Sequence, residues 1–460
     1  MEKVDVIIIG AGQAGNPLSQ AFATAGKNTV LIEEKYVGGT CVNYGCTPTK
    51  TMIASGEVAN LAKRSESYGL KIKKVKVNMK AVRERKDVIV TSFRNGSEKK
   101  IKSSGVKLIY GTAEFIDDKT VKVTTKKGKT KKLTAETIII DVGGSPNIPA
   151  IDGLDQVSLM NSTTIMELDE IPEHLIIIGG GYIALEFGQM FRRYGSEVTI
   201  LQHSEKLIGR EDDDIAEEMK KVLESEGIQV FLEADTKSIR KTAKNKIELS
   251  VALPNEERKL SGTHLLVAAG RNPNTKGLHL ENTGIKLDSR GYIQVNEKLE
   301  TNIPGVYAVG DVKGVPAFTH ISYDDFRILK ENLIDGGNRT TTNRMVPYVL
   351  FTNPQLGRIG VSEKEAKSKG LKFEVAKIPM NYVARAIETE NTAGLMKVIV
   401  DPDSKQILGA AILGMEGGEI MAMLQIAMMG KLPYTALRDG IFAHPTLAEG
   451  LNTLFGALEE

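Results

Sequence analysis

The hydrophobic pattern near the start of the chain predicts a strand, a turn, a helix and a second strand. The apolar run Val6–Ile9 is the first strand, and a helix of small residues is expected over Ser19–Gly26. The second strand, Thr29–Ile32, ends at the acid Glu33. Short apolar runs separated by a helix are typical of a parallel βαβ unit.

The turn between this strand and helix has the spacing Gly-x-Gly-x-x-Gly, at Gly10, Gly12 and Gly15. The first glycine allows a tight turn, the second lets the backbone approach a pyrophosphate, and the third packs the helix against the strand. The amide end of the helix then faces the phosphates, and Glu33 is placed to accept hydrogen bonds from a ribose. The complete unit predicts a bound dinucleotide.

The same pattern recurs in the middle of the chain. The strand Leu175–Ile178 leads through Gly179 and Gly181 into a helix that contains Ala184, and Glu197–Leu201 follows as the second strand. Two such units indicate two bound dinucleotides. A decayed repeat that no longer binds is the alternative, but each glycine remains where the backbone must approach phosphate.

Further strands are expected around the second unit. Residues Val121–Gly128 alternate with a period of two and turn at Lys127-Gly128, as in a β-hairpin. The basic run Lys126–Lys132 has two interpretations, a binding site for an anionic partner or a solvated hairpin edge. The hairpin edge is favoured, because lysines there also discourage pairing with another sheet. Leu265–Arg271 is expected to be a buried strand, and Thr301–Asp311 an apolar strand closed by Gly-Asp.

The tail beyond about residue 346 mixes strands with one apolar helix. The strands are Leu395–Val400 and Ile407–Leu413, and the Met-rich helix covers Gly418–Met429. Methionines suit a flexible binding face, but packing in a core or a dimer interface is the favoured interpretation.

Length and composition are those of an ordinary soluble protein. A chain of 460 residues is too long for one core and should form about three domains. With 26% charged residues and a net charge of +2, it gives no reason to expect nucleic acid or membrane as a partner. No apolar run reaches the roughly 18 residues of a membrane helix. Because a strand begins almost at Met1, no signal peptide is expected and the chain is predicted to be cytoplasmic.

Only two cysteines are present, Cys41 and Cys46, so a structural disulfide framework is not expected. Four intervening residues can wrap one helical turn and bring the two sulfurs within bonding distance. The pair follows Glu33 closely and should therefore lie near whatever the first unit binds. Metal ligation is the rival interpretation, weakened because a structural zinc site takes four ligands.

Together these motifs resemble the class I pyridine nucleotide-disulfide oxidoreductases, the family of dihydrolipoamide dehydrogenase, glutathione reductase and mercuric reductase. The resemblance extends from Gly10 to Glu449. Within the family, Leu207–Asp212 and Phe318–Arg327 resemble the mercuric-reductase branch, and the second stretch most resembles the copper-reducing enzyme of bacterial reactive-chlorine resistance.

The resemblance implies an α/β fold with two Rossmann-like dinucleotide-binding domains and a C-terminal α+β dimerisation domain. The expected domains are a FAD-binding domain over residues 1–149 and 273–344, an NAD(P)-binding domain over 150–272, and a dimerisation domain over 345–460.

The implied cofactors are FAD and NAD(P)H. FAD is expected on Gly10, Gly12, Gly15, Glu33, Asp311 and the backbone near Thr112 and Ala113. NAD(P)H is expected on Gly179, Gly181, Tyr182, Glu186 and Gln202. Of these, Tyr182 would shield the flavin until the nicotinamide arrives. Further cofactor-binding candidates are Gly39, Thr40, Lys50, Gly143 and Gly270.

The same resemblance implies that hydride passes from NAD(P)H to the flavin and that two electrons then reduce a Cys41–Cys46 disulfide. Cys46 is expected to be the charge-transfer thiol beside the flavin, and Cys41 the interchange thiol that attacks the substrate. Lys50 and Glu186 are expected to pair near the flavin N5, so that each buried charge is compensated. An ordinary helix-surface lysine is the alternative for Lys50.

The acid–base group is expected at His444, held by Glu449. A thiolate that leaves a disulfide must be protonated, and histidine can do this near neutral pH if a carboxylate holds its other nitrogen. In the family this pair reaches the cysteines of the other subunit, which implies a homodimer with a shared active site. Thr446 and Glu449 also have the spacing of a capping box. By its motif, His320 is expected near the flavin ring.

The chain departs from mercuric reductases in three respects. They carry a vicinal cysteine pair at the C-terminus, usually have tyrosine at the position of His444, and in many cases have an N-terminal metal-binding domain. None of these features is found here, so efficient handling of mercury is not expected, and no metal-ligating residues are predicted. His444 indicates exchange between dithiols and disulfides.

Two further positions depart from the family pattern. An NAD enzyme usually ends the second strand of its unit with an acid, whereas this chain has Gln202 followed by His203 and Ser204. Without the acid a 2′-phosphate is not repelled, and Lys206 or Arg210 can approach it, so NADPH is preferred over NADH. The stretch Asp141-Val142-Gly143-Gly144 stands where the family usually has Ala-Thr-Gly, and the sequence gives no reason for Asp141 there.

Three functions remain in competition. The leading hypothesis is an FAD enzyme that passes electrons from NAD(P)H through Cys41 and Cys46 to a small disulfide or a thiophilic acceptor. The second is a reductase of Hg(II) or Cu(II). The third, of a different class, is a non-catalytic flavin sensor of the NAD(P)H state, and the presence of Lys50, Glu186 and His444 argues against it.

Overall fold

The computed structural model describes residues 1–242 and 246–458, which fold into two compact units. The first unit contains residues 1–52, 80–147 and 270–344, and the second contains residues 53–79, 148–269 and 345–460. Helices α3 (Cys46–Lys63) and α4 (Met79–Ser103) contribute residues to both units. The finer division into FAD-binding, NAD(P)-binding and dimerisation domains stays a prediction.

An eight-stranded sheet forms the first unit, in the order β1-β6-β5-β4-β3-β2-β7-β18. Its parallel part is β4 (Lys107–Phe115), β3 (Thr29–Glu33), β2 (Val6–Ile9), β7 (Thr137–Ile140) and β18 (Val306–Ala308). The remaining strands are β5 (Thr120–Thr125), β6 (Thr130–Thr134) and β1 (Glu2–Lys3), and a separate pair joins β8 (Gly144–Pro146) to β17 (Arg271–Pro273).

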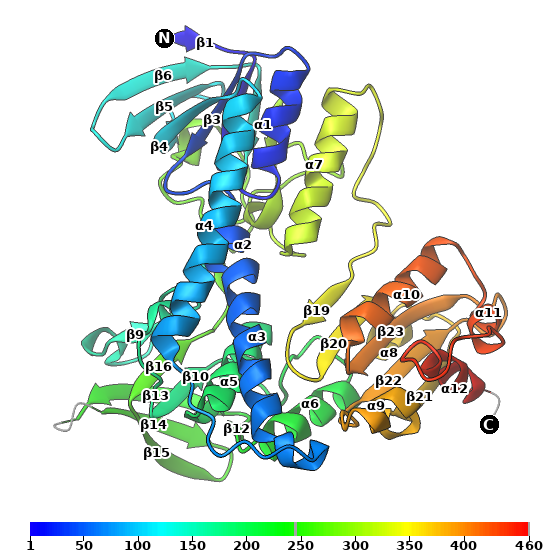
Figure 1. Ribbon diagram of the computed structural model, residues 1–460. Helices are drawn as coiled ribbons and strands as arrows, with labels where there is room; N and C mark the ends of the chain where they lie inside the picture. Colours follow the sequence, from blue (N-terminus) through cyan, green and yellow to red (C-terminus); the bar gives the residue numbers. More distant parts are fainter. Residues whose placement is uncertain (243–245, 459–460) are drawn as a thin grey trace. The chain divides into compact units, whose positions relative to one another are not determined.

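Strand β2 is apolar throughout because both faces of the sheet are covered. Ile7 and Ile9 belong to one core, while Val6 and Ile8 point to the other, as alternation along a strand requires. The second core includes side chains of α1 (Gly15–Thr24) and α7 (Thr319–Leu333), which pack side by side (Figure 1). The carboxyl ends of the parallel strands therefore meet the N-termini of these helices.

The predicted hairpin is present, but its edge was assigned to the wrong strand. Strands β5 and β6 pair antiparallel, with a turn after Thr125. Strand β1 pairs with the far side of β6, so β6 is not an edge, and Lys131 forms an ion pair with Glu2. The lysines at the turn are exposed, as expected for a solvated hairpin.

The second unit contains the second predicted parallel sheet, in the order β12-β11-β10-β16-β9. Its strands are β12 (Gln229–Phe231), β11 (Glu197–Leu201), β10 (His174–Ile178), β16 (His264–Val267) and β9 (Leu159–Met160), with helices α5 (Tyr182–Tyr194) and α6 (Asp213–Ser225). A three-stranded antiparallel sheet consists of β13 (Asp235–Lys241), β14 (Ile247–Leu253) and β15 (Glu256–Gly262).

A third sheet of the second unit is antiparallel, in the order β19-β20-β23-β22-β21. It consists of β19 (Tyr348–Leu350), β20 (Gln355–Gly360), β23 (Ile407–Gly414), β22 (Leu395–Val400) and β21 (Glu374–Pro379). The associated helices are α8 (Glu363–Ser368), α9 (Ala384–Glu388), α10 (Gly417–Met429), α11 (Tyr434–Arg438) and α12 (Gly450–Gly456). Among the described residues, no helix has both the length and the hydropathy that crossing a membrane requires.

The Met-rich helix α10 lies over β20 and β23 and packs partly in the core, as predicted. Ile420, Met421 and Leu424 are buried. Ile426 and Met429, on another face, are 67% and 66% exposed. One face of the helix therefore builds the core while another remains apolar and uncovered.

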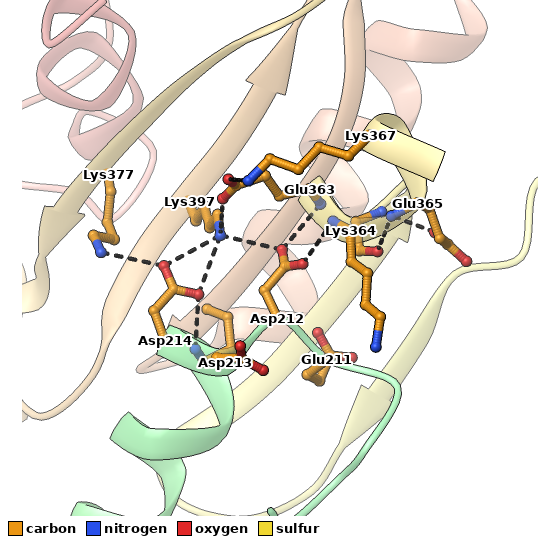
Figure 2. A network of polar contacts seen from close by, with 12 residues as sticks. Glu211, Asp212, Asp213, Asp214, Glu363, Lys364, Glu365, Lys367, Lys377 and Lys397 are labelled. Carbon is orange, nitrogen blue, oxygen red and sulfur yellow. Dashed lines mark hydrogen bonds and ion pairs between the residues drawn. The ribbon is translucent and has the colours of Figure 1, made fainter. Parts of the chain in front are cut away.

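A buried lysine joins α6 and α8 to the third sheet (Figure 2). Lys397 of β22 lies 3.1 Å from carboxylates of Asp212 and Asp214 and 2.9 Å from Glu363, and only 2% of its side chain is exposed. Although burial opposes it, the backbone N–H groups of Lys364 and Glu363 and the Lys397 ammonium hold the pKa of Asp212 below its usual value. A single cation thus holds three carboxylates that come from two helix N-termini.

Replacing this cation should destabilise the second unit. We expect Lys397→Met to cost about 3 kcal/mol or more, because the buried Asp212 would lose its counter-charge, while Asp214 and Glu363 would keep only the more exposed Lys377 and Lys367. The pKa values of Asp212, Asp214 and Glu363 are all lowered in the fold, so the lysine's contribution is complete above their ordinary values and is lost as the pH falls below them. Urea unfolding at neutral and acidic pH measures both effects.

Lys377→Met is the matched control. Lys377 is 47% exposed and contacts Asp214 alone, at 3.2 Å, so its loss should change stability by at most about 1 kcal/mol. Equal destabilisation by the two substitutions would contradict a special role for the buried lysine.

Candidate active site

The segment that carries the cysteines is attached to the first glycine turn. Gly38 donates its N–H to the Ala11 carbonyl at 2.8 Å, and the Gln13 side chain donates to the Gly38 carbonyl at 2.8 Å. Gly39 begins helix α2 (Gly39–Tyr44), and a Cβ at this position would lie 2.8 Å from the Cα of Gly12. Only glycine permits this approach, which brings α2 against the turn.

The two cysteines lie on consecutive helices. Cys41 is in α2 and is partly buried, while Cys46 is the first residue of α3 and is exposed; both are free thiols. Gly45 separates the helices, and a Cβ there would lie 3.0 Å from the Thr40 carbonyl oxygen and 3.3 Å from the Cα of Cys41. The missing side chain lets the chain fold back so that the two thiols interact.

The surroundings of the two thiols differ. The hydrogen bond to Cys46, followed by burial, raises the pKa of Cys41 well above its ordinary value, although Thr319 and Lys50 oppose this shift. The sulfur of Cys46 lies 3.3 Å from the Thr319 hydroxyl. Cys46 and Thr319 each begin a helix, and the positive ends of helix dipoles stabilise a thiolate. The arrangement therefore favours negative charge at Cys46 and a proton at Cys41.

The first glycine turn has the features that a dinucleotide needs. Gly10 has a φ of 101°, which a side chain would strain. The Glu33 carboxylate accepts the N–H groups of Ala11 at 2.9 Å and Lys35 at 2.8 Å, so its position is fixed at the end of β3. A carboxylate has about four acceptor sites, and this one retains capacity for a ribose hydroxyl. The turn and its acid thus fit an ADP-containing cofactor such as FAD.

The other residues expected at FAD lie on several elements of the first unit. Asp311 is in the short 3-10 helix η5 (Gly310–Lys313), with its carboxylate 3.7 Å from the Arg271 guanidinium. A Cβ at Gly143 would meet no atom within 4 Å. Ala113 is buried in β4, and Thr40 is exposed in α2. Their contacts with FAD stay predictions.

The second glycine turn precedes α5 in the second unit. Gly179 has a φ of 117°, and a Cβ at Gly181, the residue before the helix, would meet no atom within 4 Å. Tyr182 begins the helix and is 43% exposed. Glu186, one turn further, is buried and accepts the Phe351 N–H at 2.9 Å. This open helix N-terminus fits the diphosphate of a nicotinamide dinucleotide.

The end of β11, where the acid of an NAD enzyme is usually found, carries Gln202. Its carboxamide donates to the Lys206 carbonyl at 3.2 Å. The Lys206 ammonium is bound by Asp213 at 2.5 Å and by the Glu211 carbonyl at 2.9 Å. Lys206, one of the two cations expected at a 2′-phosphate, is therefore already paired, while Arg210 is exposed.

The structure brings some predicted site residues together and leaves others separate. His444 and Glu449 form the expected pair: Nδ1 lies 2.8 Å from Oε2, which leaves Nε2 as the nitrogen available for proton transfer. Thr446 accepts the Glu449 N–H at 3.2 Å, one half of the predicted capping box. Lys50 and Glu186 belong to different compact units, and their pairing stays a prediction, as does the position of His320 near a flavin.

Thr319 is a site residue that the sequence did not reveal. Its neighbour Cys46 is 273 positions away, and a threonine at a helix start is common enough to carry no signal alone. The resemblance of Phe318–Arg327 to one branch of a family was the only indication. Among the described residues, no group of three or more His, Cys, Asp or Glu side chains is arranged to hold a metal ion.

Comparisons with known families agree with this geometry. Residues 4–325 match the family described as pyridine nucleotide-disulphide oxidoreductase, and residues 346–455 match the dimerisation domain of the same family.

Several relatives are similar over nearly the whole chain. The probable pyridine nucleotide-disulfide oxidoreductase RclA of Escherichia coli is 36% identical, covering 100% of both chains. A mercuric reductase of Staphylococcus aureus is 34% identical over 97% of this chain and 81% of its own length. A dihydrolipoyl dehydrogenase of Thermus scotoductus is 33% identical, over 100% and 98%.

Solved structures show the same similarity. The Cu(II) complex of the HOCl-induced flavoprotein disulfide reductase RclA from Escherichia coli superimposes with a TM-score of 0.90, at 35% identity and 99% coverage of both chains. The expected α/β architecture, with Rossmann-like parallel sheets and a C-terminal dimerisation domain, is thereby confirmed.

The Thr319 hydroxyl should make Cys46 the more reactive thiol near neutral pH. We expect Thr319→Val, which keeps the shape but removes the hydroxyl, to raise the pH of half-maximal alkylation by about one unit, because a hydrogen bond to a charged group contributes roughly 1.5 kcal/mol. The measurement is the rate of iodoacetamide labelling against pH, resolved by peptide mass. Tyr323→Phe, which removes an exposed hydroxyl one turn further along the same helix, should leave the profile unchanged, because no contact of the Tyr323 hydroxyl with either sulfur is found in the described part of the chain. An unshifted profile in Thr319→Val would show that the hydroxyl does not stabilise the thiolate.

Proposed function

Because this chain belongs to the pyridine nucleotide-disulphide oxidoreductase family, we propose that it passes electrons from NADPH through FAD to the Cys41–Cys46 pair and on to a small disulfide or a thiophilic acceptor. The observation that carries this proposal is the interacting thiol pair attached to the first glycine turn through Gly38 and Gly39. The family uses FAD and NAD(P)H, and when bound FAD supplies the conversion of a hydride into an electron pair for the disulfide.

The unequal thiols suit unequal roles. With two helix N-termini and the Thr319 hydroxyl beside it, Cys46 would hold the negative charge after reduction, and it is the thiol assigned to the flavin side of the pair. Cys41 keeps the proton and becomes the nucleophile once a base removes it. Attack on an acceptor disulfide forms a mixed disulfide at Cys41. Cys46 then displaces the acceptor thiol and restores the Cys41–Cys46 bond.

The base is the partner subunit's His444 in a homodimer, where Glu449 holds the ring through Nδ1. Nε2 accepts the Cys41 proton during attack and returns one to the departing thiolate of the acceptor. The dimerisation domain and the uncovered apolar face of α10 support a dimer. A pair that cycles between dithiol and disulfide suits a reducing compartment, so we place the enzyme in the cytoplasm.

A second candidate function is reduction of a thiophilic metal ion. It is favoured by the similarity to RclA, whose structure is described as a Cu(II) complex, and to mercuric reductases. Each NAD(P)H carries two electrons, which would convert two Cu(II) ions to Cu(I) or one Hg(II) ion to Hg(0). The metal would be the acceptor at the thiol pair and not a resident cofactor.

The preference for NADPH rests on the end of β11. A carboxylate there would repel a 2′-phosphate, and Gln202 does not. Because Lys206 is paired with Asp213, the cation available to the phosphate is the exposed Arg210.

Anaerobic titration with NADPH tests the roles of the thiols. We expect a long-wavelength thiolate–flavin charge-transfer band in the native enzyme and in Cys41→Ser, and its loss in Cys46→Ser. Steady-state assays with lipoamide, glutathione disulfide, other small disulfides, Cu(II) and Hg(II) then identify the acceptor, and Cys41→Ser should lower turnover at least about 100-fold.

The outcomes separate the hypotheses. Turnover of a disulfide without metal reduction removes the second candidate, and metal turnover alone establishes it. A charge-transfer band retained by Cys46→Ser would overturn the assignment of the thiols. The absence of turnover with every acceptor would favour the flavin sensor.

The cofactor preference is tested by Gln202→Glu. We expect kcat/KM to favour NADPH over NADH in the native enzyme, and the substitution to lower that ratio roughly tenfold or more through repulsion between the carboxylate and the 2′-phosphate. Arg210→Met should lower the ratio without improving the use of NADH. A native enzyme that prefers NADH would refute the proposal.

A further inference from the structure

Asp141 directly follows β7, and its side chain lies against the first glycine turn, residues 10–15. Its N–H donates to the Ile9 carbonyl at 2.7 Å, which continues the pairing of β7 with β2, and its Oδ2 accepts the Gly15 N–H at 2.7 Å. The residue is only 7% exposed. The side-chain carboxyl of Asp141 is therefore held where the parallel strands end, at the start of α1.

Three glycines enclose this carboxyl group. A Cβ on Gly12 or Gly15 would lie 2.6 Å or 2.8 Å from Oδ2, and a Cβ on Gly310 would lie 3.0 Å from Oδ1. Gly12 and Gly15 belong to the turn expected at the FAD diphosphate, and Gly310 precedes Asp311, expected at the ribityl chain. The Asp141 side chain thus lies next to both the glycine turn and Gly310, two places where FAD is expected to bind.

Asp141 has no compensating cation within the described part of the chain. The Gly15 N–H is its one side-chain hydrogen bond there, and Oδ1 makes none. The charged groups that act most strongly on its carboxyl are acids: Asp311 from η5, Asp325 from α7 and Glu33 from β3. The nearby cations are committed elsewhere, since Lys313 lies 3.2 Å and Arg344 2.7 Å from Asp325, and Arg271 lies 3.7 Å from Asp311.

This environment disfavours a charged carboxylate. Burial, and then the three acids, raise the pKa of Asp141 well above its usual value, and the Gly15 N–H alone acts in the opposite direction. A diphosphate bound at the glycine turn would add further negative charge near an unpaired acid. A protonated carboxyl avoids this repulsion and gains an O–H donor, which a carboxylate lacks.

We propose that Asp141 is a FAD-binding residue of this chain that acts as a neutral carboxylic acid. Oδ2 accepts the Gly15 N–H and so positions the glycine turn, while the proton on Oδ1 is available as a hydrogen-bond donor to the cofactor. FAD binding then takes up one proton whenever the FAD-free chain carries Asp141 as a carboxylate. The inference rests on the FAD cofactor of the proposed function.

Retention of FAD as a function of pH tests this role. Holoenzyme is diluted serially at several pH values between about 6 and 9, and the rise in flavin fluorescence on release gives the Kd. In the native enzyme Kd should increase with pH, by up to about tenfold per unit above the pKa of Asp141 in the FAD-free chain. Asp141→Asn, neutral at every pH, should bind within about threefold of the native enzyme at the acidic end and lose this dependence.

Asp118→Asn is the matched control. Asp118 is exposed between β4 and β5, and the substitution changes the net charge by the same amount, so the native pH dependence should be retained. If Asp141→Asn and the native enzyme show the same pH dependence, the inference is overturned. A loss of FAD affinity above about 100-fold in Asp141→Asn at the acidic end would also overturn it, because a neutral side chain would then not suffice.

Infrared spectroscopy gives a readout that needs no folded variant. Native holoenzyme labelled with ¹³C-aspartate should show an isotope-shifted C=O band of a protonated carboxyl group at neutral pH. Absence of that band would refute the neutral acid even if Asp141→Asn failed to fold. A native chain that holds no FAD would refute the proposed cofactor itself, an outcome distinct from FAD binding without linkage to Asp141.

Discussion

The contact between Gly12 and Gly39 is the constraint on which the redox site depends. Because neither residue carries a side chain, the first turn of α2 can rest on the glycine turn that follows β2. Hydrogen bonds from Gly38 to Ala11 and from Gln13 to Gly38 hold the same junction. The segment that carries the cysteines is therefore attached to the first glycine turn, and backbone packing sets the positions of the two sulfur atoms.

Backbone geometry also makes the two thiols chemically different. Gly45 allows the chain to end α2 and begin α3 within one residue, so Cys46 is the first residue of its helix, whereas Cys41 is the third residue of α2. The start of α7 supplies a second N-terminus and the Thr319 hydroxyl. Cys41, more buried and hydrogen-bonded to its neighbour, retains its proton. The local backbone thus places two identical residues in different chemical surroundings.

What could be predicted from the sequence is what depends on short separations. The glycine turns, the individual βαβ units, the helix α10 and the His444–Glu449 pair depend on periodicity and local geometry over short stretches of the chain. Thr319 lies beside Cys46 across 273 positions, and Lys397 joins Asp214 across 183 positions and Glu363 of another element, so both contacts depend on the tertiary fold. Such contacts leave no periodic signal in one chain, and Lys206 shows the consequence: it was expected to be available to a phosphate but is paired with Asp213.

Buried acids in this protein are handled in two ways, and the difference explains Asp141. Asp325 has Lys313 and Arg344 beside it, and Asp212 has Lys397 and two backbone N–H groups, so each of these carboxyl groups has a neighbouring positive charge. Asp141 is surrounded by glycines, which bring no cation and leave no room for one. The one donor to its side chain within the described residues, the Gly15 N–H, also belongs to the turn proposed to bind a negatively charged diphosphate. The proposed neutral acid at this position avoids repulsion between Asp141 and that ligand, and it gives a physical reason for a residue that the family pattern does not explain.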